Sequence, residues 1–135
     1  FRPIEQSSEK IKKNGRVNID LRLTSNPDIL AWAGAHKTAG QTLCGFAMET
    51  QDLESNAAKK LTSKHCSMLV ANNLNTPGAG FAVDTNVVTV LKPGETTDEP
   101  IIEHWNKMSK QELAERILTE LAALRNTESA ESQAS

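Results

Sequence analysis

Lysines gather in two places along this chain of 135 residues. Lys10, Lys12 and Lys13 precede an Asn-Gly pair, which indicates a basic tip that closes in a turn. Lys60 and Lys64 are four residues apart, so they lie on one face of a helix that contains them. Ammonium groups neutralise phosphate charge as mobile point charges, and two such clusters suit a polyphosphate ligand. The alternative is that both clusters are ordinary solvated surface.

The segments around these lysines predict alternating strands and helices. Apolar residues at every second position predict a strand over Val17–Leu23, whose polar face suits a sheet edge or a dimer contact. Asn26 can cap a helix and Pro27 suits its first position, and this helix should end near Gly40. A short apolar run over Thr42–Phe46 predicts a buried strand.

The second half of the chain continues the alternation with two helices and two strands. The first helix of this half, the second of the chain, is capped by Thr50 or Asp52. Apolar strands are expected over 67–71 and 87–91. Ser109–Glu112 forms a capping box that opens the last helix. Short apolar strands that alternate with helices are typical of an α/β domain. We expect a Rossmann-like three-layer αβα arrangement with a mostly parallel sheet.

Ligands of an open α/β sheet bind beyond the carboxyl ends of its strands. Residues 26–28, 45–50 and 71–73 are expected there. Glu49 at such an end suits compensation of a helix dipole, with magnesium binding as the alternative. The chain has neither a GxGxxG fingerprint nor a GxxxxGK[ST] loop, and Pro77–Gly80 is typical of an ordinary turn.

The composition argues against several classes of protein. Fifteen Lys and Arg against seventeen Asp and Glu give a net charge of −2, which does not suit a basic nucleic-acid binder or a polybasic membrane face. Its apolar runs are shorter than the roughly 18 residues that span a bilayer. Scattered histidines and the lack of a CxxC pair argue against a zinc site, and Cys44 and Cys66 suit a reducing cytoplasm.

Six short motifs occur in an order that resembles one enzyme family. They are KIKK at 10–13, NPDIL at 26–30, GFAMET at 45–50, the pair Lys60 and Lys64, VANN at 70–73 and GFAVDTN at 80–86. Together they are similar to the carboxy-terminal part of bacterial phosphopantothenoylcysteine synthetase, from residue 1 to about residue 124. That enzyme is commonly fused behind a flavin-dependent decarboxylase, so FMN is expected only if such a domain precedes this chain.

The resemblance implies a ligase of coenzyme A biosynthesis that joins 4′-phosphopantothenate to L-cysteine. It implies CTP with Mg²⁺, an acyl-cytidylate intermediate and a homodimer. Lys10 would be catalytic, and Lys12 and Lys13 would complete its motif. Independently of the resemblance, lysines on a glycine-ended tip suit a lid that closes over the phosphates and excludes water. Contacts with CTP are implied for Lys10 and for seven further residues, which are Pro27, Asp28, Ile29, Leu30, Phe46, Lys60 and Lys64. We therefore expect the basic tip and the middle helix to converge on one triphosphate.

Two departures from the family pattern limit this inference. Asn73 stands where the family usually has an acid. The family domain also begins upstream, with a strand and a glycine-rich turn, so we expect an incomplete domain over 1–126, a disordered tail over 127–135 and no turnover by this chain alone. The alternatives are a non-catalytic α/β module that binds a nucleotide or another anion or only oligomerises, and a different Rossmann-like nucleotide domain.

Overall fold

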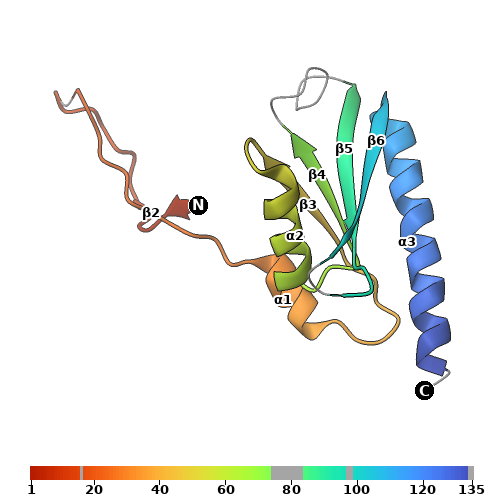
Figure 1. Ribbon diagram of the computed structural model, residues 1–135. Helices are drawn as coiled ribbons and strands as arrows, with labels where there is room; N and C mark the ends of the chain where they lie inside the picture. Colours follow the sequence, from red (N-terminus) through yellow and green to blue (C-terminus); the bar gives the residue numbers. More distant parts are fainter. Residues whose placement is uncertain (16, 74–83, 97–98, 134–135) are drawn as a thin grey trace.

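The computed structural model describes residues 1–15, 17–73, 84–96 and 99–133, with side chains as far as residue 127. The described residues up to 24 form an extended arm, and the described residues from 29 onward form a body of helices and one sheet (Figure 1). The elements of the body are α1 (Ile29–His36), β3 (Cys44–Glu49), α2 (Leu53–Ser63), β4 (Met68–Asn73), β5 (Thr85–Lys92), β6 (Ile101–Ser109) and α3 (Lys110–Gln133).

The four strands of the body form one mixed sheet in the order β3-β4-β5-β6. β3 and β4 are parallel, whereas β5 and β6 are each antiparallel to the preceding strand. The expected parallel pairing therefore holds for β3 and β4 only. A parallel crossover needs a dozen or more residues, and the connections that precede β5 and β6 are shorter than that.

β6 is a strand that the sequence pattern does not predict. Most of its side chains are exposed and several are charged, because it lies at one end of the sheet order, where one strand edge has no neighbour in the described sheet. A half-solvated edge strand lacks the continuous apolar run on which the other predictions rested. The strands expected over 42–46, 67–71 and 87–91 are confirmed with boundaries shifted by a few residues.

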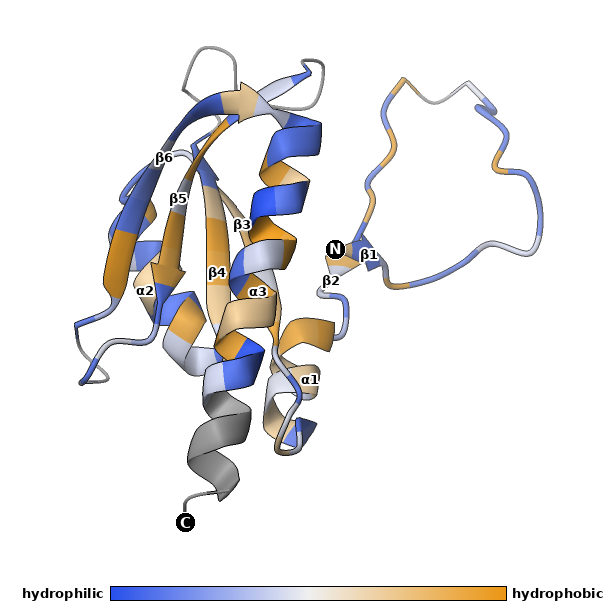
Figure 2. Ribbon diagram, turned by 90° about the vertical axis from the view of Figure 1, so that its right-hand side faces the viewer, coloured by the Kyte–Doolittle hydropathy of each residue, from blue (hydrophilic) through white to orange (hydrophobic). Residues whose placement is uncertain are grey.

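Helices cover both faces of the sheet, as a three-layer α/β arrangement requires (Figures 1 and 2). α1 and α2 lie on one face and α3 lies on the other. The core on the α2 side contains Ala47, Ala57, Leu61, Cys66, Leu69, Ala71 and Leu91. The core on the α3 side contains Met68, Val70, Val88, Val90, Trp105, Leu113 and Ile117. The Rossmann-like α/β prediction is thus confirmed.

The arm is a two-stranded ribbon that is paired only at its base. β1 (Arg2–Pro3) is antiparallel to β2 (Leu23–Thr24). The strand predicted over Val17–Leu23 is wrong, since only its last residue is in a strand and Val17 is 96% exposed. A two-stranded ribbon that packs on no third strand or helix has no surface against which to bury its apolar face. The predicted turn is confirmed, because Asn14 and Gly15 both have the positive φ that a type I′ turn requires.

The helix ends correct two further expectations. Asp28, and not Asn26, caps α1: its Oδ1 accepts a hydrogen bond of 2.9 Å from the amide of Ala31. α1 ends at His36, earlier than expected. Asp52 is the N-cap of α2, with a φ of 48° and no side-chain cap bond.

The capping box of α3 is confirmed by two reciprocal hydrogen bonds. The amide of Glu112 donates to Ser109 Oγ at 3.1 Å, and the amide of Ser109 donates to Glu112 Oε2 at 2.9 Å. α3 then continues to Gln133, through residues for which the sequence predicted a disordered tail. Alanine and glutamate favour helix, and extending an existing helix is far easier than starting one. None of the described helices is long and apolar enough to cross a membrane.

Candidate functional site

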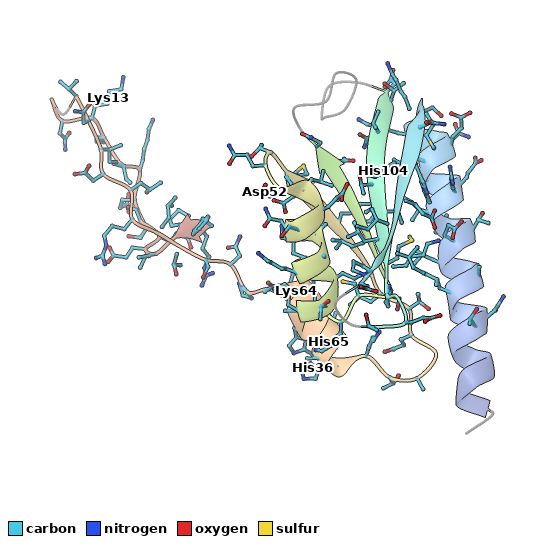
Figure 3. The ribbon with its side chains drawn as sticks, in the orientation of Figure 1. Lys13, His36, Asp52, Lys64, His65 and His104 are labelled. Carbon is cyan, nitrogen blue, oxygen red and sulfur yellow. The ribbon has the colours of Figure 1, made fainter. Side chains whose placement is uncertain are left out.

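Asp28 and Lys64 form an ion pair between two segments that lie far apart in the sequence. Lys64 Nζ donates to Asp28 Oδ2, while the other carboxylate oxygen caps α1. The bond from Lys64, and then the bond from the Ala31 amide, lower the pKa of Asp28 below its ordinary value. The pair places the NPDIL segment beside the carboxyl-terminal end of α2, where Figure 3 labels Lys64.

Two glycines allow the backbones behind this ion pair to approach closely. A Cβ on Gly34 would lie 1.9 Å from the carbonyl oxygen of Lys64, so α1 rests directly on the end of α2. A Cβ on Gly45 would lie 2.9 Å from Leu30 and 2.6 Å from Leu69. Larger residues at either position would push α1 away from the site.

A second ion pair joins α2 to the carboxyl end of β3. Lys60 Nζ donates to Glu49 Oε1, and Asn56 Nδ2 donates to Glu49 Oε2 at 3.4 Å. The side chain of Glu49 is only 13% exposed, whereas that of Lys60 is 46% exposed. The sequence pattern favours a dipole role for Glu49, whereas in the structure its carboxylate accepts hydrogen bonds from two side chains of α2. Spacing alone does not predict this contact, since the partners are on different elements.

We call Asp28, Glu49, Lys60 and Lys64 the charged row. Its lysines are four residues apart on α2, and its carboxylates come from the start of α1 and the end of β3. Two cations and two anions leave the row with no net charge. The row thus has the donors that a phosphate needs but lacks the excess positive charge that would draw in a triphosphate.

The apolar residues with implied nucleotide contacts divide into two groups. Ile29 is 77% exposed and Phe46 is 68% exposed, so both are open to a ligand. Leu30 packs against the core on the α2 side, which makes it a support for α1. Pro27 is exposed immediately before the Asp28 cap.

The basic tip lies away from the charged row. Figure 3 shows Lys13 at the far end of the arm, and the arm projects from the body in the views of Figures 1 and 2 as well. Lys10 and Lys12 belong to the same arm. The predicted convergence of the two lysine clusters therefore does not occur within one chain, because the tip has nothing to pack against on its own body.

A cavity of about 480 Å³ opens near the carboxyl end of β4. Asp52, Ser55, Asn73 and Thr89 are among the residues that line it. Asn73 is in register with Glu49 on the neighbouring parallel strand, so the departure from the family pattern lies next to the charged row. The glycine loop at 77–80 lies outside the described residues.

Potential metal ligands do not cluster in the part of the chain that the structure describes, and its two cysteines are free thiols. Across residues 1–15, 17–73, 84–96 and 99–133, no three His, Cys, Asp or Glu side chains gather as a metal site. Cys44 and Cys66 are free thiols. Burial, and then the proximity of Cys66, raises the pKa of Cys44 to about 11. Burial also raises the pKa of Cys66.

Comparison with known proteins gives consistent matches. The chain is 42% identical over 126 residues to the coenzyme A biosynthesis bifunctional protein CoaBC of Bacillus subtilis (strain 168), covering 92% of this chain and 29% of that protein. It is 38% identical over 125 residues to a cysteine/cysteine sulfinic acid decarboxylase from an unknown prokaryotic organism, covering 92% and 33%. The chain thus spans about a third of each of these relatives, whose names describe the longer proteins.

A solved structure and a family model agree with these matches. The crystal structure of the C-terminal domain of a coenzyme A biosynthesis bifunctional protein CoaBC superposes with a TM-score of 0.62 at 29% identity, covering 79% of this chain and 46% of that one. Residues 1–124 match the model of the DNA/pantothenate metabolism flavoprotein C-terminal domain. The chain belongs to the family of DNA/pantothenate metabolism flavoprotein C-terminal domains.

Proposed function

We propose that this chain is the carboxy-terminal part of a phosphopantothenate–cysteine ligase of coenzyme A biosynthesis, which uses CTP. In this reaction the carboxylate of 4′-phosphopantothenate attacks the α-phosphorus of CTP and pyrophosphate leaves. The amine of L-cysteine then attacks the acyl carbon of the acyl-cytidylate, and CMP leaves. The name of the Bacillus subtilis relative supports the pathway, and the phosphate donors of the charged row support the use of a nucleotide.

One observation carries this proposal. The charged row brings together three motifs that the resemblance associates with CTP: the NPDIL segment through Asp28, the GFAMET segment through Glu49 and the helix lysines. These motifs are separated along the chain and meet only through tertiary contacts. Lysines that served solubility alone would not require these three motifs to meet at one place in the fold.

Lys60 and Lys64 would stabilise negative charge on the phosphates. Attack on the α-phosphorus builds charge on the phosphoryl and pyrophosphate oxygens, and fixed cations stabilise that charge more in the transition state than in the ground state. Phe46 and Ile29 would provide apolar contacts for the nucleoside, since both are exposed. Lys10 would supply a further cation for the same charge.

A homodimer would bring Lys10 to the site. The arm exposes Val17, Ile19 and Leu21 with relative exposures of 96%, 60% and 62%, and such an alternating apolar edge suits a partner chain. A charged row with no net charge needs additional positive charge to hold a triphosphate, and the tip of a partner's arm carries it. Lys12 and Lys13 would then help to close the site against water, which protects the acyl-cytidylate from hydrolysis.

Magnesium would enter with the nucleotide. Mg²⁺ usually keeps several waters and is held by substrate phosphates together with one or two carboxylates. Asp28 and Glu49 are the carboxylates of the charged row, and both already accept bonds from lysine. These residues fit a metal held mainly by phosphates better than a site built from the protein alone. FMN would belong to a fused decarboxylase domain, if one precedes this chain.

The test uses the natural-length protein that contains this chain. We expect it to form phosphopantothenoylcysteine from phosphopantothenate, L-cysteine and CTP, with far slower turnover when ATP replaces CTP. Lys10→Gln should lower kcat by roughly 100-fold or more, as expected for loss of a charge that stabilises a transition state. Lys107→Gln, an exposed lysine of β6, should leave kcat unchanged. Lack of CTP-dependent product would instead favour the non-catalytic module.

A further inference from the structure

Glu49 is held in place on both of its carboxylate oxygens. Oε1 accepts from Lys60 and Oε2 accepts from Asn56. The two donors are four residues apart, so they lie on one face of α2. Asn56 Nδ2 also donates to the carbonyl oxygen of Gln51 at 3.2 Å, which ties it to the segment between β3 and α2. The carboxylate at the end of β3 is therefore fixed from two directions.

Lys60 is ordered by this contact without being enclosed. Nearly half of its side chain is exposed, and its ammonium group has three donor hydrogens, of which the bond to Glu49 uses one. A lysine side chain in solution occupies many rotamers, and a ligand that orders it must offset that entropy. An ammonium group that the protein has already ordered binds a phosphate with less of this penalty.

We propose that Glu49 is a positioning residue that orders the Lys60 ammonium for a phosphate of the bound nucleotide, with Asn56 holding the carboxylate in place. This inference rests on the proposed function and assigns a role to a residue that the motif resemblance leaves without one. The charge of Glu49 opposes an anion, but the bond to Glu49 leaves two donor hydrogens of Lys60 for the phosphate. We expect the ordering of the lysine to outweigh the repulsion.

A double-mutant cycle on CTP affinity tests this role. The natural-length protein is titrated with CTP and Mg²⁺ by calorimetry as wild type, Glu49→Ala, Lys60→Ala and the double variant. We expect Glu49→Ala to raise the dissociation constant about fivefold in the wild-type background and to have little effect once Lys60 is alanine. A purely structural contribution of Glu49 would weaken binding equally in both backgrounds.

Matched controls separate positioning from loss of folding. Glu103→Ala removes a carboxylate that also binds a lysine, but on β6, at the other end of the sheet order, and should leave CTP affinity unchanged. Lys59→Ala removes an exposed lysine of the same helix and should have no effect. Should Glu49→Ala fail to give a cooperative thermal transition, Glu49→Gln keeps the shape and should weaken CTP binding in the same direction.

The outcomes distinguish the two proposals. Absence of CTP binding by the wild type contradicts the proposed function. CTP binding that Glu49→Ala leaves unchanged or tightens, or weakens equally with and without Lys60, contradicts the positioning role alone.

Discussion

The arm and the body differ in charge, packing and exposure. Residues 1–24 contain six Lys and Arg against three Asp and Glu, a net charge of +3, whereas residues 25–135 contain nine against fourteen, a net charge of −5. The arm leaves its apolar side chains exposed, whereas the body buries two apolar cores. This opposite charge, together with the exposed apolar side chains of the arm, suits the homodimer proposed above. The balanced total charge conceals this asymmetry.

The largest contrast between arm and body should appear in stability. Leu69 is fully buried, so Leu69→Ala should lower the free energy of unfolding by about 3 kcal/mol. Val17→Ala in the exposed arm should change it by less than about 0.5 kcal/mol. Urea denaturation followed by circular dichroism, at a concentration that keeps the protein monomeric, measures both. Equal losses would mean that the arm packs on its own body.

Thiol chemistry gives a second contrast. Burial raises the pKa of Cys44 to about 11 from an ordinary value of 9.0, so its thiolate population at pH 8 is roughly 100-fold smaller than that of a free thiol. Native protein should therefore react slowly with a disulfide reagent at pH 8, whereas Val17→Cys should add one rapidly reacting thiol in the arm. In urea, Cys44 and Cys66 should both react rapidly in the same assay. Rapid reaction of Cys44 in the folded protein would contradict its burial.

The arm's apolar edge should matter only in association. In the proposed homodimer a partner chain would bury apolar surface at Val17 and Leu21. Val17→Asp combined with Leu21→Asp would place charges there, so the dissociation constant of that dimer should rise by at least roughly tenfold. Leu118→Asp is the matched control, because Leu118 is an exposed leucine of the body, at 66% exposure. Sedimentation equilibrium measures the constants. An unchanged constant for the arm variant, or an equal rise for the control, would remove the arm from the interface.

The smallest expected effect concerns an ionic contact that holds α3 to β6. Lys92 Nζ donates to Glu103 at 2.7 Å and to Glu120 at 2.8 Å, and the indole of Trp105 donates to Glu103 at 3.0 Å. Glu103→Ala leaves this indole without its acceptor and should lower the free energy of unfolding by about 1 kcal/mol. Glu115→Ala, at an exposed site of α3, is the control.

The pH dependence of this contact has a definite sign. The bond from Lys92, and then the bond from Trp105, lower the pKa of Glu103 below its ordinary value of 4.5. A lowered carboxylate pKa stabilises the fold above pH 4.5, and this contribution is lost as the pH falls through the lower value of the folded state. Wild type and Glu103→Ala should therefore converge in stability at acidic pH. A gap that widens on acidification would contradict the ionic origin.

Local signals predicted the elements that bury a continuous apolar face. The capping box before α3, the stripe of α2 and the apolar runs of β3, β4 and β5 follow from residue type and period. The same logic failed for Val17–Leu23, where clean alternation exists but the described residues offer no layer to cover it. It failed again for β6, where solvated side chains hide a strand that backbone pairing with β5 defines. Periodicity of apolar residues predicts which side chains are buried. Val17–Leu23 has the periodicity without the burial, and β6 has the backbone hydrogen bonds of a strand although most of its side chains are exposed.

The sequence by itself determined the α/β class, the capping box of α3 and the two lysine clusters, because these depend on residues close together in the chain. Tertiary structure decided that β5 and β6 run antiparallel, that Glu49 rather than solvent accepts from Lys60, and that Lys10 lies apart from both. Those outcomes depend on which distant backbones meet, as Gly34 and Lys64 do where α1 rests on the end of α2. Local spacing in the sequence does not predict such contacts, because they form only when the layers of the fold pack together.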